Sequence, residues 1–310
     1  MKFPLAAAQG GRGEMSVEVR DPRIVSVVGA ASASEVERIG TGFQFTEGPV
    51  WHPLERFLLF TDISGDCIWR WSEEGGAQAF RTPSHMANGL TYDRQGRLIA
   101  CEHATSRVTR TERDGAITVL ASRYEGKELN SPNDVVVQSD GAIYFTDPPY
   151  GRMAPHGVPR PQQLSFQGVY RIAPGDGALR LLCADFDRPN GLCLSLDERR
   201  LFVNDSGRNH IRVFGLDAGT LTGGRVWAET VGEGGGVPDG MKIDSEGYLY
   251  SCGPGGLHVF DPDGTCLGVI GVPETPANFT WGGADLRSLF IAACTSVYRI
   301  RVRVPGRSVF

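Results

Sequence analysis

The sequence predicts an all-β protein folded as a six-bladed β-propeller. One short apolar strand recurs six times, at intervals of 40 to 58 residues, which is about the length of a four-stranded propeller blade. Each copy follows another apolar strand and precedes an alternating one, with glycine-containing turns between them. No stretch keeps a 3.6-residue apolar period, so we expect no long helix.

The six recurring strands and their surroundings define the blades. The strands read RFLLFTD, GRLIACE, GAIYFTD, RRLFVND, GYLYSCG and RSLFIAA, and they end at Asp62, Glu102, Asp147, Asp205, Gly253 and Ala293. The strands before them begin with small or polar residues and read EGPVWHP, NGLTYDR, NDVVVQS, NGLCLSL, DGMKIDS and GGADLRS. In the fifth blade, GMKID and YLYSCG are expected to pair as a hairpin around the turn at Ser245, Glu246 and Gly247.

Six blades of about 50 residues occupy nearly the whole chain, so we expect one propeller domain at 36–310. Residues 1–35 are expected to be a flexible leader and the segment that leads into the propeller. The strand-like stretch VERIGTGFQF precedes the first blade. We expect it to complete the last blade beside SVYRIRVRV, which would close the ring and cover exposed strand edges.

Composition and charge exclude several classes of partner. The net charge is −5 with a pI near 5.7, and no apolar run approaches the length of about 18 residues that spans a bilayer. We therefore expect no nucleic-acid partner, no membrane and a monomer or weak homodimer. The seven cysteines are odd in number and form no C-x-x-C pair, which favours reduced, mostly buried thiols in a cytoplasmic protein.

A polar residue recurs at the start of the first strand of each blade, where a propeller strand faces the channel. These entrance residues are Glu47, Asn88, Asn133, Asn190 and Asp239, and the sixth blade diverges around Asn278 to Gly283. A single Asn-Gly or Asp-Gly is more often a turn dipeptide. Here the polar residue recurs in phase with the blade and precedes a strand, which favours a shared site on the channel axis.

The entrance residues predict a central metal site. Carboxylate and amide oxygens are hard donors, and Glu47 and Asp239 supply two negative charges. We expect one divalent ion held by Glu47, Asn133, Asn190 and Asp239. Ca²⁺ is the first choice, with Mg²⁺, Mn²⁺, Zn²⁺ or Fe²⁺ as alternatives; no thiolate or histidine cluster marks a structural zinc site.

The motifs EGPVW, SPNDVVV, GAIYFTDPPYG, RPNGLCLSLDERRLFVND and VPDGMKIDSEGYLY resemble those of the SMP-30/gluconolactonase family, and especially its bacterial gluconolactonase-like members. The resemblance runs from about residue 40 to 303 and implies a six-bladed propeller with a divalent metal in the channel. It implies that Glu47, Asn190 and Asp239 are metal ligands and that Asp239 is also the general base. By the same resemblance Asn133 contacts metal or substrate. Ser131 stands where regucalcin-like members carry a substrate-contacting arginine.

These residues predict a metal-dependent lactonase that hydrolyses a sugar lactone or a related small lactone. The alternatives are a phosphotriesterase- or fluorophosphatase-like hydrolase and a non-catalytic ligand-binding propeller with structural Ca²⁺. Asp239 is either the base or a ligand only, with bulk water as base. Carboxylates that end the recurring strands are the other candidate bases, and we expect them to be solvated structural groups. They are Asp147, Glu102 and Asp205.

Substrate contacts are expected from both the entrance strands and a long loop. The expected substrate contacts are Asn88, Asn133, Tyr150 and His103. Residues 148–167 are rich in proline, lack a strand pattern and follow a recurring strand, so we expect them to fold over one face of the propeller. Tyr150, Arg152 and His156 in this loop either contact substrate in place of the missing arginine or pack at the rim.

Overall fold

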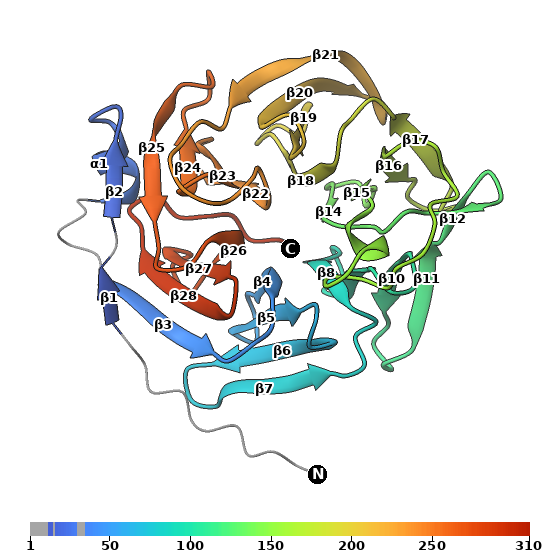
Figure 1. The fold of residues 1–310 in the computed structure, drawn as a ribbon, viewed down its shortest axis with the longest axis horizontal. Helices are drawn as coiled ribbons and strands as arrows, with labels where there is room; N and C mark the ends of the chain where they lie inside the picture. Colours follow the sequence, from blue (N-terminus) through green and yellow to red (C-terminus); the bar gives the residue numbers. More distant parts are fainter. Residues whose placement is uncertain (1–11, 15, 30–34) are drawn as a thin grey trace.

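The computed structural model describes residues 12–14, 16–29 and 35–310 and contains six antiparallel sheets arranged in a ring (Figure 1). This arrangement confirms the predicted all-β, six-bladed propeller. The helices of the described part are the five-residue α1 (Ile24–Val28) and the 3₁₀ turn η2 (Tyr150–Arg152). Within the described ranges, neither has the length and apolar character that a membrane crossing requires.

Each blade runs from an inner strand beside the channel to an outer strand at the circumference. The first blade contains β4 (Thr46–His52), β5 (Phe57–Asp62), β6 (Cys67–Ser72) and β7 (Gly76–Arg81). The second contains β8 (Ala87–Tyr92), β9 (Leu98–Glu102), β10 (Arg107–Thr111) and β11 (Ile117–Ala121). The small hairpin of β12 (Arg123–Tyr124) and β13 (Lys127–Glu128) follows.

The remaining blades repeat this order. The third contains β14 (Val135–Val137), β15 (Ile143–Asp147), β16 (Gly168–Ile172) and β17 (Leu179–Cys183). The fourth contains β18 (Pro189–Leu194), β19 (Arg200–Asp205), β20 (His210–Asp217) and β21 (Thr220–Glu229). The fifth contains β22 (Met241–Ile243), β23 (Leu249–Gly253), β24 (Gly256–Phe260) and β25 (Cys266–Gly271), and the sixth begins with β26 (Pro276–Gly282), β27 (Ser288–Ala293) and β28 (Ser296–Arg301).

The second strand of every blade ends at the residue that the sequence pattern predicts. These strands are β5, β9, β15, β19, β23 and β27. The expected hairpin of the fifth blade also forms, because β22 pairs antiparallel with β23 from Met241 opposite Ser251 to Ile243 opposite Leu249. The repeat in the sequence is therefore the repeat of the structure.

The N-terminal part of the chain closes the ring. Strand β3 (Glu35–Thr41) pairs antiparallel with β28 and supplies the outer strand of the sixth blade, as predicted. Strand β1 (Arg12–Glu14) extends that sheet beyond β3. This pairing joins the N-terminal segment to the last blade at the circumference of the ring. The inner strands are not involved in it and face the channel.

Part of the segment that was expected to be a flexible leader is folded against the propeller. Strand β2 (Ser16–Val19) pairs with β25 at the outer edge of the fifth blade, and α1 buries Ile24 and Val27 against the core. These residues pack on the propeller because apolar side chains at this spacing cover an otherwise open sheet edge. Residues 1–11, 15 and 30–34 of the expected leader lie outside the described residues.

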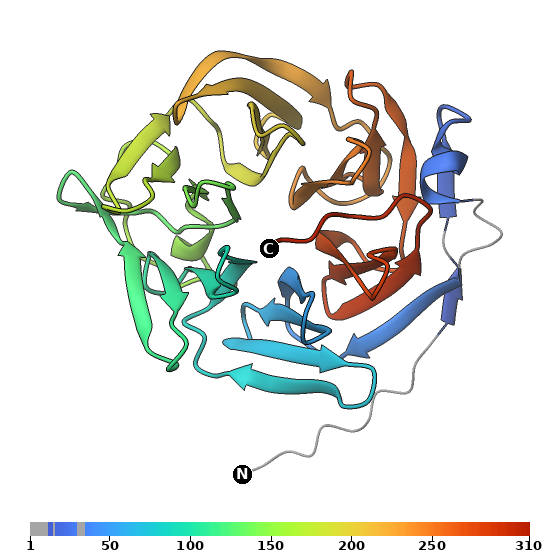
Figure 2. The ribbon, with the colours of Figure 1, turned by 180° about the vertical axis from the view of Figure 1, so that it is seen from behind.

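Apolar side chains pack mainly between neighbouring blades. Phe290 of the sixth blade stacks on Trp51 of the first, with ring centroids 5.4 Å apart and planes 10° from parallel. The last residues of the chain run to the centre of the ring in both views (Figures 1 and 2). There Phe310 contacts His52 and Tyr92 at the far ends of β4 and β8. The opposite ends of these strands carry Glu47 and Asn88, which places the polar site at the other mouth of the channel.

Candidate active site

A cavity of about 140 Å³ lies at the mouth where the inner strands begin. The four predicted metal ligands and the predicted substrate contacts Asn88, His103 and Tyr150 all line it. The lining residues are Phe45, Glu47, Ile63, Asn88, His103, Asn133, Tyr150, His156, Asn190, Val237 and Asp239. The structure thus brings together side chains from five blades and from the long loop between β15 and β16.

Glycines after the entrance residues allow the inner strands to converge. A Cβ atom at Gly191 would lie 2.2 Å from the carbonyl oxygen of Asp239, and one at Gly89 would lie 2.5 Å from that of Asn133. A Cβ atom at Gly48 would likewise meet the carbonyl oxygen of Asn88, at 2.0 Å, whereas one at Gly240 would meet the side chain of Asn278, at 2.2 Å. Only glycine permits so close a backbone approach. The Asn-Gly and Asp-Gly pairs are therefore packing points between blades rather than turns.

The two entrance carboxylates, the buried Glu47 and the half-buried Asp239, lie side by side in the channel. Glu47 accepts hydrogen bonds from its neighbour Gly48 and, at 3.0 Å, from Asn278 Nδ2 of the divergent sixth blade. Burial and the nearby charge of Asp134 raise the pKa of Glu47 to about 7. Burial and then the charge of Glu47 raise the pKa of Asp239 well above its ordinary value. Both carboxylic acids therefore lack a full counter-charge among their protein neighbours.

Sequence reasoning missed Asp134 and Lys242, which extend this polar cluster into the channel. Asp134 follows Asn133 at the position where other blades have glycine, and its Oδ2 is buried without a hydrogen-bond partner. Lys242 donates to Asn278 Oδ1 at 3.4 Å. The signals were present, since an acid replaces glycine in SPNDVVV and a lysine interrupts the apolar strand in DGMKID.

Neutral polar groups hold the other side of the cavity in place. Asn190 Nδ2 donates to Ser206 Oγ at 3.1 Å, and Ser206 Oγ donates to the carbonyl of Pro238 at 2.5 Å, just before Asp239. Burial raises the pKa of Tyr150, so its phenol stays protonated at neutral pH and can donate a hydrogen bond. The site therefore combines acidic groups with fixed amide and hydroxyl groups.

His103 is a neutral hydrogen-bond acceptor in this cavity. Burial lowers the pKa of His103 to about 4. Its Nδ1 lies 2.9 Å from the carbonyl oxygen of His156, which can only accept, so Nδ1 carries the proton. The unprotonated Nε2 then lies 3.2 Å from Asn88 Nδ2 and accepts from it. The tautomer of His103 is thus fixed by the backbone carbonyl of His156.

The other candidate bases do not line the cavity. Glu102, Asp147 and Asp205 are fully buried rather than solvated, so that expectation was wrong. Asp147 accepts hydrogen bonds from the backbone N–H groups of Asn130 and Ser131, both at 2.8 Å. Glu102 and Asp205 pair with arginines at 2.7 and 2.6 Å. These strand-end carboxylates stabilise the turns that lead into the inner strands.

Residues 148–161, here named the cover segment, form one wall of the site. Tyr150 and His156 line the cavity, and the His156 ring lies 4.2 Å from that of Phe45. Arg152 does not contact the cavity: its side chain is 2% exposed and donates to backbone carbonyls. Of the two alternatives for Arg152, the structure therefore favours packing at the rim over a substrate contact. Ser131 is also engaged, since its hydroxyl donates to Pro148 and accepts from Gly151.

The donor set of the cavity fits a hard cation. Within the described residues, no group of three or more His, Cys, Asp and Glu side chains is placed to hold a metal ion. The expected set is of another kind, because two of its four members are asparagines. Its oxygen donors, the raised pKa values of its acids and the unpartnered oxygen of Asp134 are all compatible with a divalent ion.

Fold and site together define a propeller protein with a carboxylate and carboxamide cavity at one channel mouth. Residues 45–295 match the family model described as SMP-30/Gluconolactonase/LRE-like region, and the chain belongs to this family. It is 35% identical to the gluconolactonase of Zymomonas mobilis over 92% of this chain and 85% of that protein. It is 28% identical to pentonolactonase XacC of Haloferax volcanii, covering 82% of each. A solved gluconolactonase from Xanthomonas campestris superposes with a TM-score of 0.88 at 33% identity, covering 96% of this chain and 99% of that one.

Proposed function

We propose that this chain is a metal-dependent lactonase that hydrolyses a sugar lactone or a related small lactone. Full-length similarity to a gluconolactonase and a pentonolactonase supports the broader statement that it is a lactone-hydrolysing hydrolase. The observation that carries the finer proposal is the cavity itself. It gathers the buried Glu47 and half-buried Asp239 carboxyl groups, which repel each other, with three carboxamides at one mouth of the channel.

The proposed metal ligands are Glu47, Asn133, Asn190 and Asp239. A divalent cation bound there would offset the repulsion that raises the pKa values of Glu47 and Asp239. All four residues offer oxygen donors, so Ca²⁺ is the first choice and Mg²⁺, Mn²⁺, Zn²⁺ or Fe²⁺ are alternatives. When bound, the cation polarises the lactone carbonyl and stabilises the oxyanion that develops on it.

Asp239 is the proposed general base. Among the four carboxylates considered for this role, it is the one that lines the cavity. A water molecule adds to the lactone carbonyl carbon while its proton passes to the Asp239 carboxylate. The ring C–O bond then breaks, the released ring oxygen takes up a proton, and the product is an open-chain hydroxy acid.

Asn88, Asn133, His103 and Tyr150 are proposed to orient the lactone. A substrate hydroxyl can replace Asn88 Nδ2 as the donor to His103 Nε2, and the Tyr150 hydroxyl can donate to a substrate oxygen. Phe45 and Val237 supply apolar surface to the cavity. With Ser131 occupied by backbone groups, recognition falls to these neutral donors and acceptors rather than to a cation.

A substrate comparison tests the proposal. Acid release from glucono-1,5-lactone, from a pentonolactone and from a phosphotriester is measured at constant pH, with and without a chelator. The proposal expects chelator-sensitive hydrolysis of a lactone and little turnover of the phosphotriester. Faster phosphotriester cleavage would favour a phosphotriesterase-like enzyme. No turnover of any ester by protein with metal bound would favour a binding propeller with structural Ca²⁺.

Two further expectations remain predictions. The cytoplasmic location and the monomeric or weakly dimeric state rest on composition and on the cysteines. All seven cysteines are unpaired, and four of them are buried. Burial raises the pKa of the Cys101 and Cys252 thiols, so neither is a reactive thiolate at neutral pH.

A further inference from the structure

Two arginines fasten the cover segment over the cavity. The segment crosses from the third blade toward the first two, where Ser64 Oγ donates to the carbonyl of Pro155 at 3.1 Å. Between its ends it presents Tyr150 and His156 to the cavity. Such a segment has few apolar contacts of its own, so its position depends on polar ties to the blades. Most of these ties come from Arg152 and Arg160.

Arg160 joins the cover segment to the turn that carries His103. Its guanidinium donates to the carbonyl of His103 at 2.8 Å and to Ser106 Oγ at 2.6 Å, both in the second blade. It also donates to the carbonyls of Gly151 at 3.1 Å and Val158 at 2.9 Å, on either side of His156. One planar side chain therefore fixes the spacing between His103 and the stretch that contains His156.

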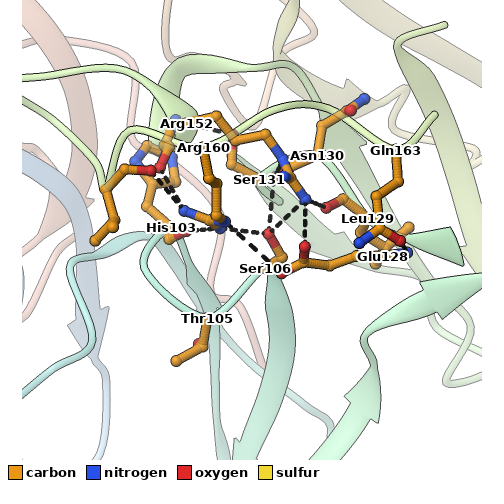
Figure 3. A network of polar contacts seen from close by, with 12 residues as sticks. His103, Thr105, Ser106, Glu128, Leu129, Asn130, Ser131, Arg152, Arg160 and Gln163 are labelled. Carbon is orange, nitrogen blue, oxygen red and sulfur yellow. Dashed lines mark hydrogen bonds and ion pairs between the residues drawn. The ribbon is translucent and has the colours of Figure 1, made fainter. Parts of the chain in front are cut away.

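Arg152 and Glu128 complete this clamp. Figure 3 shows both arginines reaching from the cover segment toward Ser106 and the backbone at 128–130. One oxygen of Glu128 lies 2.9 Å from Arg152, and the other lies 3.7 Å from Arg160. Two guanidinium groups thus share one carboxylate, and backbone carbonyls accept most of their remaining hydrogens. The side chains are largely buried, so these charge-assisted bonds are not screened as surface pairs are.

The clamp acts on the chemistry of the cavity through a single hydrogen bond. The carbonyl of His156 accepts the Nδ1 proton of His103, which leaves Nε2 as the acceptor that faces Asn88. If the cover segment shifts, His103 loses the partner that selects this tautomer. An imidazole that presents Nε2–H instead would donate toward Asn88 Nδ2, which is also a donor, and would no longer accept from a substrate hydroxyl.

We propose that Arg160, supported by Arg152 and Glu128, is a positioning residue that holds His103 in its acceptor tautomer and Tyr150 at the cavity wall. The inference rests on the proposed function in one respect, namely that His103 and Tyr150 contact the lactone. The tautomer of His103 can be measured without any substrate. Failure of this proposal and failure of the lactonase proposal therefore give different results.

The test compares Arg160→Met and Arg160→Lys with Arg212→Met. Arg212 is a matched control because its side chain is 15% exposed, against 19% for Arg160, and it pairs with Asp185 in the fourth blade. Two-dimensional ¹H–¹⁵N spectra of histidine-labelled protein report the tautomer of each imidazole, and a His103→Gln variant assigns the His103 signals. Steady-state hydrolysis of the best lactone and the bound metal content are measured on the same preparations.

Wild type and Arg212→Met should show His103 with the proton on Nδ1. Arg160→Met should show a mixture of tautomers, unchanged metal content and a kcat/KM lower by about 10- to 100-fold, mostly through KM. Arg160→Lys should fall between them, because an ammonium cannot span the four acceptors. A folded Arg160→Met protein that keeps the wild-type His103 spectrum overturns the proposal, whatever its rate. So does an altered spectrum with wild-type kcat/KM.

Discussion

Replacement of Gly151 by alanine should displace the wall of the cavity. A Cβ atom at this position would lie 2.5 Å from His103 Cβ and 2.7 Å from Ser131 Cβ. Carbon atoms pack at about 3.5–4.0 Å, so the chains must separate by about 1 Å or more. Neither neighbour can move away by a rotamer change, because a Cβ atom is fixed by its backbone. Gly151 itself is held by a 2.9 Å bond from its N–H to Ser131 Oγ.

The expected effect is larger on activity than on stability. Overpacking of this kind costs about 1–3 kcal/mol of unfolding free energy. A misplacement of about 1 Å near a reacting group can lower the rate by about 10²-fold. We therefore expect Gly151→Ala to remain folded and to lose on the order of 10² in kcat/KM on the best lactone.

The matched control is Gly75→Ala. A Cβ atom there would meet only the ends of two side chains, the Ser72 hydroxyl at 3.1 Å and the Gln78 amide nitrogen at 3.4 Å, on an outer turn of the first blade. This variant should keep the wild-type kcat/KM. The reasoning is refuted if Gly151→Ala, folded and with its metal bound, hydrolyses the lactone at the wild-type rate.

Three further variants test the base, the core and a buried imidazole. Asp239→Asn should keep much of its metal while kcat falls by about 10²–10⁴-fold, since an amide ligates but accepts no proton; a wild-type rate would make Asp239 a ligand only. In urea titrations Phe290→Ala should lower the free energy of unfolding by about 3–5 kcal/mol, whereas Phe80→Ala, at a half-exposed position, should lower it by less than about 0.5 kcal/mol. Equal losses would contradict the packing of Phe290 between blades. Because burial lowers the pKa of His103 from 6.5 to about 4, this imidazole binds more protons in the unfolded state between these values, so the contribution of His103 to stability should rise with pH by about 3 kcal/mol. A His103→Gln variant should lack this rise, and an unchanged slope would show that another group titrates.

The periodic part of the fold could be predicted because every blade repeats the same order of strands and turns. An inner strand packed on both faces is continuously apolar, and a second strand ends where its turn needs a carboxylate. Asp147 shows why the strand ends were predictable while their role was not. Its pattern marks the end of β15, but only the structure shows that both of its oxygens accept backbone N–H groups.

The site could be predicted as a set of residues but not as a network. Entrance residues in phase with the blades had to meet, because the strands that carry them converge on one axis. Contacts between distant segments leave no local pattern, which is why the sequence could not decide between a substrate contact and rim packing for Arg152, whose side chain binds carbonyls of residues 129 and 130. Asp134 and Lys242 were missed because each occupies a strand position that the other blades fill with small or apolar residues.

We propose that the cavity at the channel mouth hydrolyses a lactone with one divalent ion held by the entrance residues. The most direct test titrates metal-free protein with Ca²⁺, and with each alternative ion, while bound metal and lactone hydrolysis are measured on the same samples. We predict that the rate of lactone hydrolysis rises in proportion to metal occupancy and that binding saturates at one ion per chain. The Asp239→Ala variant should neither bind the ion tightly nor hydrolyse the lactone. Full hydrolysis by metal-free protein, or tight binding of the same ion by Asp239→Ala, would contradict it.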